Sequence, residues 1–197
     1  LKKRYSSLVG INPTKGFKRS QQTMLGKNLV EWDIGGQKKY RNKFIKDAGI
    51  YLFDTNLIFY LVDVRNKKRF KESAEYFADI TSRLRELEQK PPIIVCLHKM
   101  DPEIKDEKEY AVRCEKLKEV FSKIGQGFSL KFFESSIFDN YSLVKTFSAG
   151  ITTMSPNKEI FQAQLKWFSQ VVNAKSSLLL NDQSIILGNY SVNEESG

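Results

Sequence analysis

The chain has 197 residues, of which 41% are hydrophobic and 28% are charged, the balance of an ordinary globular protein. No apolar run approaches the roughly 20 residues that a membrane helix needs, and the residues that follow Leu1 include no apolar segment of a secretory signal. The 32 basic and 23 acidic residues give a net charge of +9. Because the two signs are interspersed and no nucleic-acid-binding motif accompanies them, we expect a mostly solvated basic surface and no nucleic-acid partner.

The cysteine content favours a reducing compartment. Cys96 lies in an apolar strand pattern and Cys114 in a charged helical pattern, so the simplest interpretation is two free thiols in the cytoplasm. A metal site built from two cysteines and the single histidine, His98, is not expected.

Short apolar strands alternate with amphipathic helices along the first 154 residues. The pattern predicts strands at 29–32, 57–64, 93–97 and 128–133, the second and third of them strongly buried, and helices at 69–90, 107–124 and 139–153. Pro91 and Pro92 end the first of these helices. This order predicts an α/β fold with a mainly parallel sheet and helices on both faces. The helical positions expected to face the core are Phe70, Ala74, Phe77, Ile80 or Thr81, Leu84 and Leu87 in the first helix, and Val112, Leu117, Val120, Phe121 and Ile124 in the second.

The pattern changes after residues 155–157, which break the regular order. An amphipathic helix follows, and two apolar segments, 177–180 and 184–188, then flank a turn at 181–183 in the manner of a hairpin. A helix and one hairpin cannot form a core alone. We therefore expect residues 1–154 to form one domain and residues 155–197 to be the start of a second.

The segment 32–37 reads Trp-Asp-Ile-Gly-Gly-Gln and follows a predicted strand. Asp33 can reach a magnesium ion through water, the backbone N–H of Gly36 can approach a γ-phosphate, and Gln37 can orient an attacking water. A strand that ends in Asp and Gly can equally be a simple turn. The nucleotide interpretation gains weight from a second motif downstream.

The second motif, His98-Lys99-Met100-Asp101, follows a buried strand and falls where open α/β sheets bind ligands. The Asp101 carboxylate can accept the N1–H and N2–H₂ donors of guanine, and the Lys99 stem can lie along the base. The alternative is that Asp101 caps a helix that begins at Pro102. After the next strand, the amides and hydroxyls of Ser135, Ser136 and Ile137 can meet the guanine O6, although a serine pair at a strand end is also ordinary loop chemistry.

Upstream, Thr14 lies in a Pro-Thr-Lys-Gly segment and supplies a hydroxyl that can coordinate Mg²⁺ in the presence of a γ-phosphate. An ordinary turn is the alternative. The basic residues after Gln37 form either an effector surface or a solvated face; they are Lys38, Lys39, Arg41, Lys43 and Lys46.

These motifs resemble the small GTPases of the Ras superfamily, and most closely the Rag/Gtr branch. Trp-Asp-x-Gly-Gly-Gln is shared by the Arf and Rag groups, and His-Lys-Met-Asp, Ser136-Ile137-Phe138-Asp139 and Met24-Leu25-Gly26-Lys27-Asn28-Leu29 are similar to Rag proteins. The Pro13-Thr14-x-Gly16-Phe17 element is closer to Arf. The resemblance covers essentially the whole chain.

The resemblance implies a switch that binds GTP or GDP with Mg²⁺ and hydrolyses GTP slowly, aided by GTPase-activating and exchange proteins. Gln37 would be catalytic, and Thr14 and Asp33 would serve the metal directly and through water. The segment after residue 155 resembles the opening of a roadblock-type domain, which implies a homo- or heterodimer and peripheral membrane association through partners. The residues that would bind the nucleotide are Gly36, His98, Lys99, Asp101, Ser135, Ser136 and Ile137.

One family element is absent from the sequence. No G-x-x-x-x-G-K-[ST] phosphate loop occurs, because Gly26-Lys27 is followed by Asn28 and belongs to a hairpin. Either the first strand and its loop precede Leu1 in the complete protein, which we favour, or this protein lacks them. The second case describes a non-catalytic scaffold or dimerisation protein with a GTPase-like fold.

Overall fold

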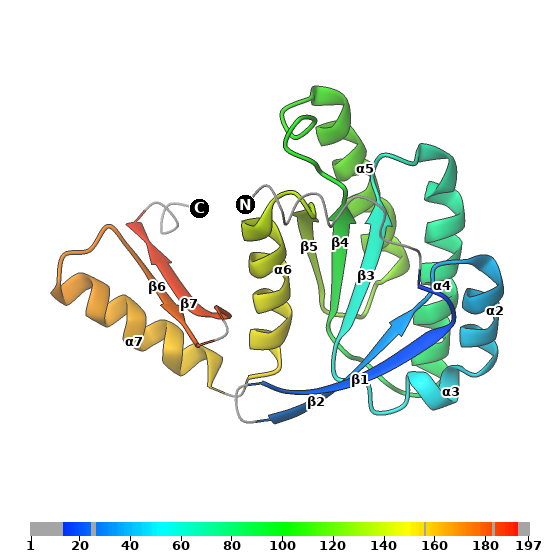
Figure 1. Ribbon diagram of the computed structural model, residues 1–197, viewed down its shortest axis with the longest axis horizontal. Coiled ribbons are helices and arrows are strands. Elements are labelled where there is room, and N and C mark those ends of the chain that lie inside the picture. Colours follow the sequence, from blue (N-terminus) through cyan, green and yellow to red (C-terminus); the bar gives the residue numbers. More distant parts are fainter. Residues whose placement is uncertain (1–13, 25–26, 156, 183, 193–197) are drawn as a thin grey trace.

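The computed structural model describes residues 14–24, 27–155, 157–182 and 184–192 (Figure 1). The sequence features assigned to Leu1, Pro13, Leu25 and Gly26 lie outside these residues. Within the described part, the strands form a central three-stranded sheet and two separate hairpins.

The central sheet is parallel and has the order β3-β4-β5, with β3 at Ile58–Asp63, β4 at Ile93–His98 and β5 at Leu130–Ser135. The middle strand is buried over Ile93–Leu97, as its uninterrupted apolar sequence predicts. In the register, Asp63 lies opposite His98, which lies opposite Ser135. The carboxyl ends of the three strands therefore meet at one edge of the sheet.

Helices cover both faces of this sheet, so the predicted fold class is confirmed (Figure 1). A short 3-10 turn, η1 (Lys67–Arg69), leads into α4 (Phe70–Glu86), which packs with α5 (Lys108–Ile124) on one face. Phe77 of α4 and Phe121 of α5 are fully buried and meet at a ring distance of 5.0 Å. On the other face, Phe147 of α6 (Asn140–Thr153) stacks on Phe59 of β3.

Two predictions of burial in α5 (Lys108–Ile124) were wrong. Val112 and Val120 of α5 are 46% and 41% exposed, whereas Cys114 is buried beside Leu117 and Phe121. The buried three recur at intervals of three and four residues on one helical face, and the two valines fall away from it.

Strand β3 is also less buried than its apolar sequence predicts. Leu61 is 60% exposed, while Tyr60, Val62 and Val64 are buried. Because side chains alternate along a strand, Leu61 lies on the face opposite Tyr60 and Val62.

A long antiparallel hairpin of β1 (Phe17–Met24) and β2 (Lys27–Ile34) lies apart from the central sheet (Figure 1). The sequence predicted a hairpin at Gly26-Lys27 but not the bounds of β1, because the polar side chains of this strand are largely exposed on both faces and give no period-two pattern. Two helices follow, α2 (Lys38–Lys46) and α3 (Ala48–Tyr51), and Phe17 stacks on Tyr51 at 4.9 Å.

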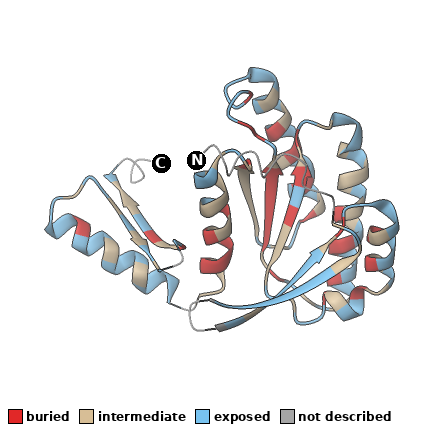
Figure 2. Cartoon of the chain, in the orientation of Figure 1, coloured by how far each residue is buried: buried red, intermediate tan, exposed pale blue. Residues whose placement is uncertain are grey.

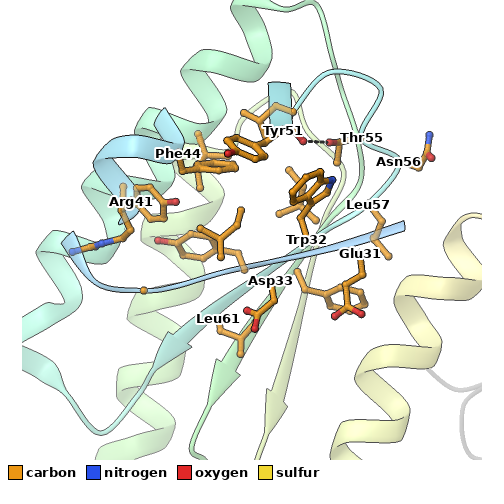
Figure 3. Close-up of a pocket in the computed structure, with 18 of the residues that line it drawn as sticks. Glu31, Trp32, Asp33, Arg41, Phe44, Tyr51, Thr55, Asn56, Leu57 and Leu61 are labelled. Carbon is orange, nitrogen blue, oxygen red and sulfur yellow. Dashed lines mark hydrogen bonds between the residues drawn. The ribbon is translucent and has the colours of Figure 1, made fainter. Parts of the chain in front are cut away.

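A groove of about 860 Å³ separates β2 from β3 (Figure 3). Consecutive residues of both strands line it, which is the arrangement expected where strand edges, rather than faces, border a space. Within the described residues β2 pairs with β1 and β3 pairs with β4, so each has one unpaired edge. Trp32, Tyr51 and Phe44 form an aromatic wall at one side of the groove.

The predicted helix and hairpin of the tail are present as α7 (Lys158–Val171), β6 (Ser176–Leu180) and β7 (Ile186–Ser191). This unit meets the rest of the chain at α6, where the Ser148 hydroxyl accepts the Ile186 N–H at 2.9 Å. Figure 2 shows that much of its surface is exposed, including Trp167 at 62%. The division into domains at residues 154 and 155 stays a prediction.

Cys96 and Cys114 are free thiols, as the sequence predicts, and both are buried, which was not predicted for Cys114. No helix among the described residues is long and apolar enough to cross a membrane.

Candidate functional site

The structure brings together the two residues assigned to the metal. The Thr14 hydroxyl donates to Asp33 Oδ2 at 2.9 Å, although 19 positions separate them. The hairpin explains this contact: Phe17 pairs with Ile34, so the segment before β1 and the end of β2 lie side by side. A hydroxyl and a carboxylate oxygen are ligands that Mg²⁺ prefers, so these residues fit the ion. Among the described residues no group of three or more His, Cys, Asp or Glu gathers at one point, so phosphate and water oxygens would complete its shell.

The two glycines after Asp33 have different surroundings. Gly35 donates its N–H to the Gly16 carbonyl at 2.9 Å. A Cβ at Gly35 would overlap the Thr14 carbonyl oxygen and would lie 2.9 Å from the Tyr40 ring. A Cβ at Gly36 would have no atom within 4 Å. Gly35 is thus required for local packing, whereas Gly36 is exposed and its surroundings leave room for a phosphate to approach the backbone.

Gln37 stands at the N-terminal end of α2 with an exposed side chain. Its carbonyl accepts the N–H of Arg41 at 3.1 Å and so starts the helix. The amide side chain has no capping bond to the helix. It is therefore available to orient a water molecule.

The contact of Arg69 with Gly36 was not identified from the sequence, and Arg41, which was predicted to lie on an effector surface or a solvated face, is instead buried at 7% exposure. Arg69 Nη2 donates to the Gly36 carbonyl at 3.4 Å and its Nε donates to Glu72 at 3.1 Å. The buried Arg41 also donates to Glu72 and lies over the Tyr76 ring. These hydrogen bonds, first from Arg69 and then from Arg41, lower the pKa of Glu72. The spacing of Arg69 and Glu72 on a predicted helix was a signal, but nothing in the sequence connects them to Gly36.

The second group of predicted residues gathers at the carboxyl ends of β4 and β5. Asp101 is 4% exposed, and its Oδ1 accepts the Ser136 hydroxyl at 2.6 Å. Its Oδ2 accepts Arg65 Nη1 at 2.7 Å. The helix after this loop begins at Lys108 with Glu107 at its N-cap, so the alternative of Asp101 as the cap of a helix starting at Pro102 does not hold.

The loop after β5 is fixed to this carboxylate. Ser136 Oγ also accepts the Phe138 N–H, and the Ser136 N–H donates to Ser142 Oγ at 3.1 Å. His98 Nδ1 and Ser135 Oγ lie 3.1 Å apart, and burial lowers the pKa of His98 from its ordinary value of 6.5. Ile137 is half-buried in the same loop.

Asp63, at the end of β3, connects the two groups. It lines the groove together with Asp33 and Gly36. Its Oδ2 accepts Lys99 Nζ at 2.6 Å. Lys99 has a φ of +67°, a conformation that non-glycine residues rarely adopt and that tends to be held at binding sites. The predicted phosphate-facing and base-facing residues therefore lie along one edge of the molecule.

Comparison with known proteins identifies the family of the chain. Residues 6–196 match the model of the Gtr1/RagA G protein conserved region. The GTP-binding protein GTR1 of Saccharomyces cerevisiae is 29% identical over 159 residues, which cover 79% of this chain and 50% of that protein. The Ras-related GTP-binding protein B of Rattus norvegicus and that of Mus musculus are each 21% identical over 196 residues, 97% of this chain and 51% of theirs. The chain spans about half the length of these curated relatives, and it belongs to the Gtr1/RagA family of G proteins.

Proposed function

We propose that this protein is a Rag/Gtr-like small GTPase, a switch that binds GTP or GDP with Mg²⁺ and hydrolyses GTP slowly. One observation carries the proposal: the group of Thr14, Asp33 and Gly36 is connected to the loop of Asp101 by an ion pair. Asp63 lines the same groove as Asp33 and Gly36, and it pairs with Lys99, two residues before Asp101. A nucleotide has its phosphates at one end and its base at the other. This edge of the molecule offers oxygen ligands and an open amide at one end and a buried carboxylate at the other.

Each residue has a distinct task in this proposal. Thr14 and Asp33 hold the metal, Gly36 donates its N–H to the γ-phosphate, and Gln37 positions the attacking water. Bound Mg²⁺ would supply positive charge to the phosphate oxygens during transfer. Lys99 lies along the base, and Asp101 selects guanine because adenine offers no matching pair of donors. His98, Ser135, Ser136 and Ile137 hold the surrounding loops.

The groove between β2 and β3 supports the favoured explanation for the absent phosphate loop. Its two unpaired strand edges and apolar lining match the requirements of one more strand. We propose that a strand running parallel to β3 fills it and leads into a G-x-x-x-x-G-K-[ST] loop near Asp33 and Asp63. Residues 1–154 would then be the nucleotide domain without that strand and loop.

The tail is proposed to be the start of a roadblock-like dimerisation domain. Its exposed apolar side chains support a role in pairing, either with a second copy or with a related GTPase subunit. GTPase-activating and exchange proteins would act on the nucleotide domain in the cytoplasm, and association with a membrane would depend on partners. The exposed apolar residues of the tail are Ile160, Trp167, Phe168, Val171, Val172, Leu178, Leu180 and Val192.

The alternative is a non-catalytic scaffold that shares the fold but has no phosphate loop. The two proposals differ in whether the complete gene encodes that loop and in whether the protein holds nucleotide.

The deciding experiment is to purify the protein expressed from the complete gene, denature it and identify any released nucleotide by ion-pair chromatography. Stoichiometric GDP or GTP is the expected result. A folded protein that releases none and does not bind added GTP with Mg²⁺ would contradict the switch and favour the scaffold.

A further inference from the structure

The Asp101 carboxylate, the proposed guanine selector, is already bonded by two protein donors. Ser136 Oγ lies 2.6 Å from Oδ1, and Arg65 Nη1 lies 2.7 Å from Oδ2. The Asp101 side chain is 5% exposed, whereas that of Arg65 is 45% exposed. Arg65 therefore covers Oδ2 from the solvent side, and a ligand that approaches the carboxylate from solvent meets this guanidinium first.

The two donors on Asp101 differ in how tightly they are held. Ser136 is fully buried and its hydroxyl oxygen also accepts the Phe138 N–H at 3.0 Å, which fixes it in the loop after β5. The Arg65 backbone is held by its N–H bond to Asp63 Oδ1 at 3.0 Å, but its side chain is long and reaches across to Asp101. Ser136 is thus a permanent partner and Arg65 a movable one.

A guanidinium and the guanine edge carry the same chemistry. Each presents adjacent, coplanar N–H donors that match a carboxylate. Arg65 thus offers to Asp101 the type of donor that N1–H and N2–H₂ of guanine would offer. A buried carboxylate without a partner is costly, so a donor that covers it between ligands stabilises the folded protein.

A second acceptor lies next to the first. Arg65 Nη1 is 3.4 Å from Glu103 Oε1, and Glu103 is 64% exposed. A small rotation of the Arg65 side chain would exchange the buried carboxylate of Asp101 for the exposed carboxylate of Glu103. The guanidinium would remain paired in both positions, so the exchange leaves no charge unpartnered.

We propose that Arg65 occupies the guanine-binding position of Asp101 in the empty protein. When the base binds Asp101, the Arg65 side chain is displaced and pairs with Glu103. This proposal rests on the proposed function, because it takes Asp101 as the guanine selector. Arg65 competes with the nucleotide, so the measured affinity is the intrinsic affinity reduced by the fraction of molecules in which Oδ2 is open.

The test measures binding of fluorescent mant-GDP to the full-length protein by stopped flow at 0.3 M salt. Removing the competitor with Arg65→Ala is expected to raise the association rate and to lower the Kd by about three- to tenfold, the range of one exposed charge-assisted contact. Arg83→Ala is the matched control, because Arg83 has a similar exposure of 46% and pairs with Glu86 away from the site. It is expected to leave both values unchanged.

Glu103→Gln should act in the opposite direction. It removes the second position of Arg65 and is expected to weaken mant-GDP binding by about twofold. In the Arg65→Ala background the same change should have no effect. If Arg65→Ala folds poorly, Arg65→Gln keeps a neutral donor and is expected to give an intermediate gain.

Binding that is unchanged or weaker in both Arg65→Ala and Arg65→Gln would overturn the proposal and make Arg65 a support for Asp101. The Asp101→Asn variant separates this failure from failure of the proposed function. A switch in preference from GDP to XDP in that variant keeps the guanine site even if Arg65 does not compete. If the preference does not switch, the guanine site itself is wrong.

Discussion

Gln37 is exposed at the start of α2, and no helix-capping bond holds its side chain. Replacement by Leu should leave the helix intact, because Gln37 is the N-cap residue and contributes its carbonyl rather than its side chain. We expect Gln37→Leu to lower single-turnover GTP hydrolysis by about tenfold or more while GTP binding is retained. Rapid-quench assays with and without an activating protein would measure this.

The neighbouring Lys38→Leu variant is the control, since it changes an exposed side chain of the same turn. Equal hydrolysis rates in wild type and Gln37→Leu, with and without the activating protein, would remove Gln37 from the catalytic role.

The protonation of His98, which lies next to Lys99 and Asp101, makes the stability of the fold depend on pH. Burial lowers its pKa below the ordinary value of 6.5, so the unfolded chain binds a proton more readily than the folded protein. Stability is therefore complete above pH 6.5 and falls as the pH drops through the window between 6.5 and the lower folded pKa. His98 is the only histidine in the sequence, so NMR can follow its ring protons without ambiguity.

The expected result is a folded-state midpoint below 6.5 and a loss of stability on acidification through that window that is smaller in His98→Gln. A midpoint above 6.5 would contradict the burial of this ring.

At the level of single residues, the sequence motifs named candidate groups but could not show which groups they contact. Thr14 and Asp33 could be assigned to one task because a hydroxyl and a carboxylate share a preference for Mg²⁺. Arg65 could not, because its contact with Asp101 spans 36 positions and depends on the order of strands in the sheet. Side-chain pairing across a sheet has no periodic signature in the sequence.

At the level of elements, helix α5 shows how burial depends on the exact helical face. Leu117 is 4% exposed and Val120 is 41% exposed, although both were predicted to face the core. We expect Leu117→Ala to lower the free energy of unfolding by about 2–5 kcal/mol. Val120→Ala should change it by about 0.5 kcal/mol or less. Equilibrium urea denaturation of the two variants would measure both.

Similar losses in the two variants would contradict the orientation of this helix. The sequence identified α5 because apolar residues recur at helical intervals, but two overlapping apolar sets were present in its pattern. Packing against α4 selects the set that contains Cys114, Leu117 and Phe121.

Strand β1 illustrates the opposite limit. Its segment 18–22 is polar, so period-two reasoning finds no strand there. Its structure comes from backbone pairing with β2 rather than from a buried face. Such a strand can be found only after its partner is known.

At the level of the whole molecule, the tail presents the largest group of exposed apolar side chains. Trp167 and Val171 lie four residues apart on α7, so they share one face of the helix, and they are 62% and 63% exposed. If this face is a dimer surface, Trp167→Glu should lower the dimer fraction of the full-length protein by about tenfold or more, because it places a charge in an apolar interface. Sedimentation velocity would measure the self-association or the pairing with a related subunit.

Ser82→Glu adds the same charge to an exposed position of α4, outside the tail, and serves as the control. An unchanged dimer fraction in Trp167→Glu would exclude this face from the interface.

The type and order of the strands and helices were predicted, whereas the pairing of neighbouring strands was not. Alternating strands and helices identified the parallel sheet, but the pattern could not show that the β1–β2 hairpin is separated from β3 by a groove. Sequence patterns give the type and order of strands. Which strands pair is decided by long-range packing.

The two buried thiols have a practical consequence. Burial raises the pKa of Cys96 to about 12 and that of Cys114 to about 11, so almost no reactive thiolate exists at neutral pH. Both thiols lie in the layer formed by the central sheet and α5, and neither lies in the hairpin β1–β2 or in the tail. The rate of alkylation would therefore report how often this layer opens. It would not be sensitive to local unfolding elsewhere in the chain.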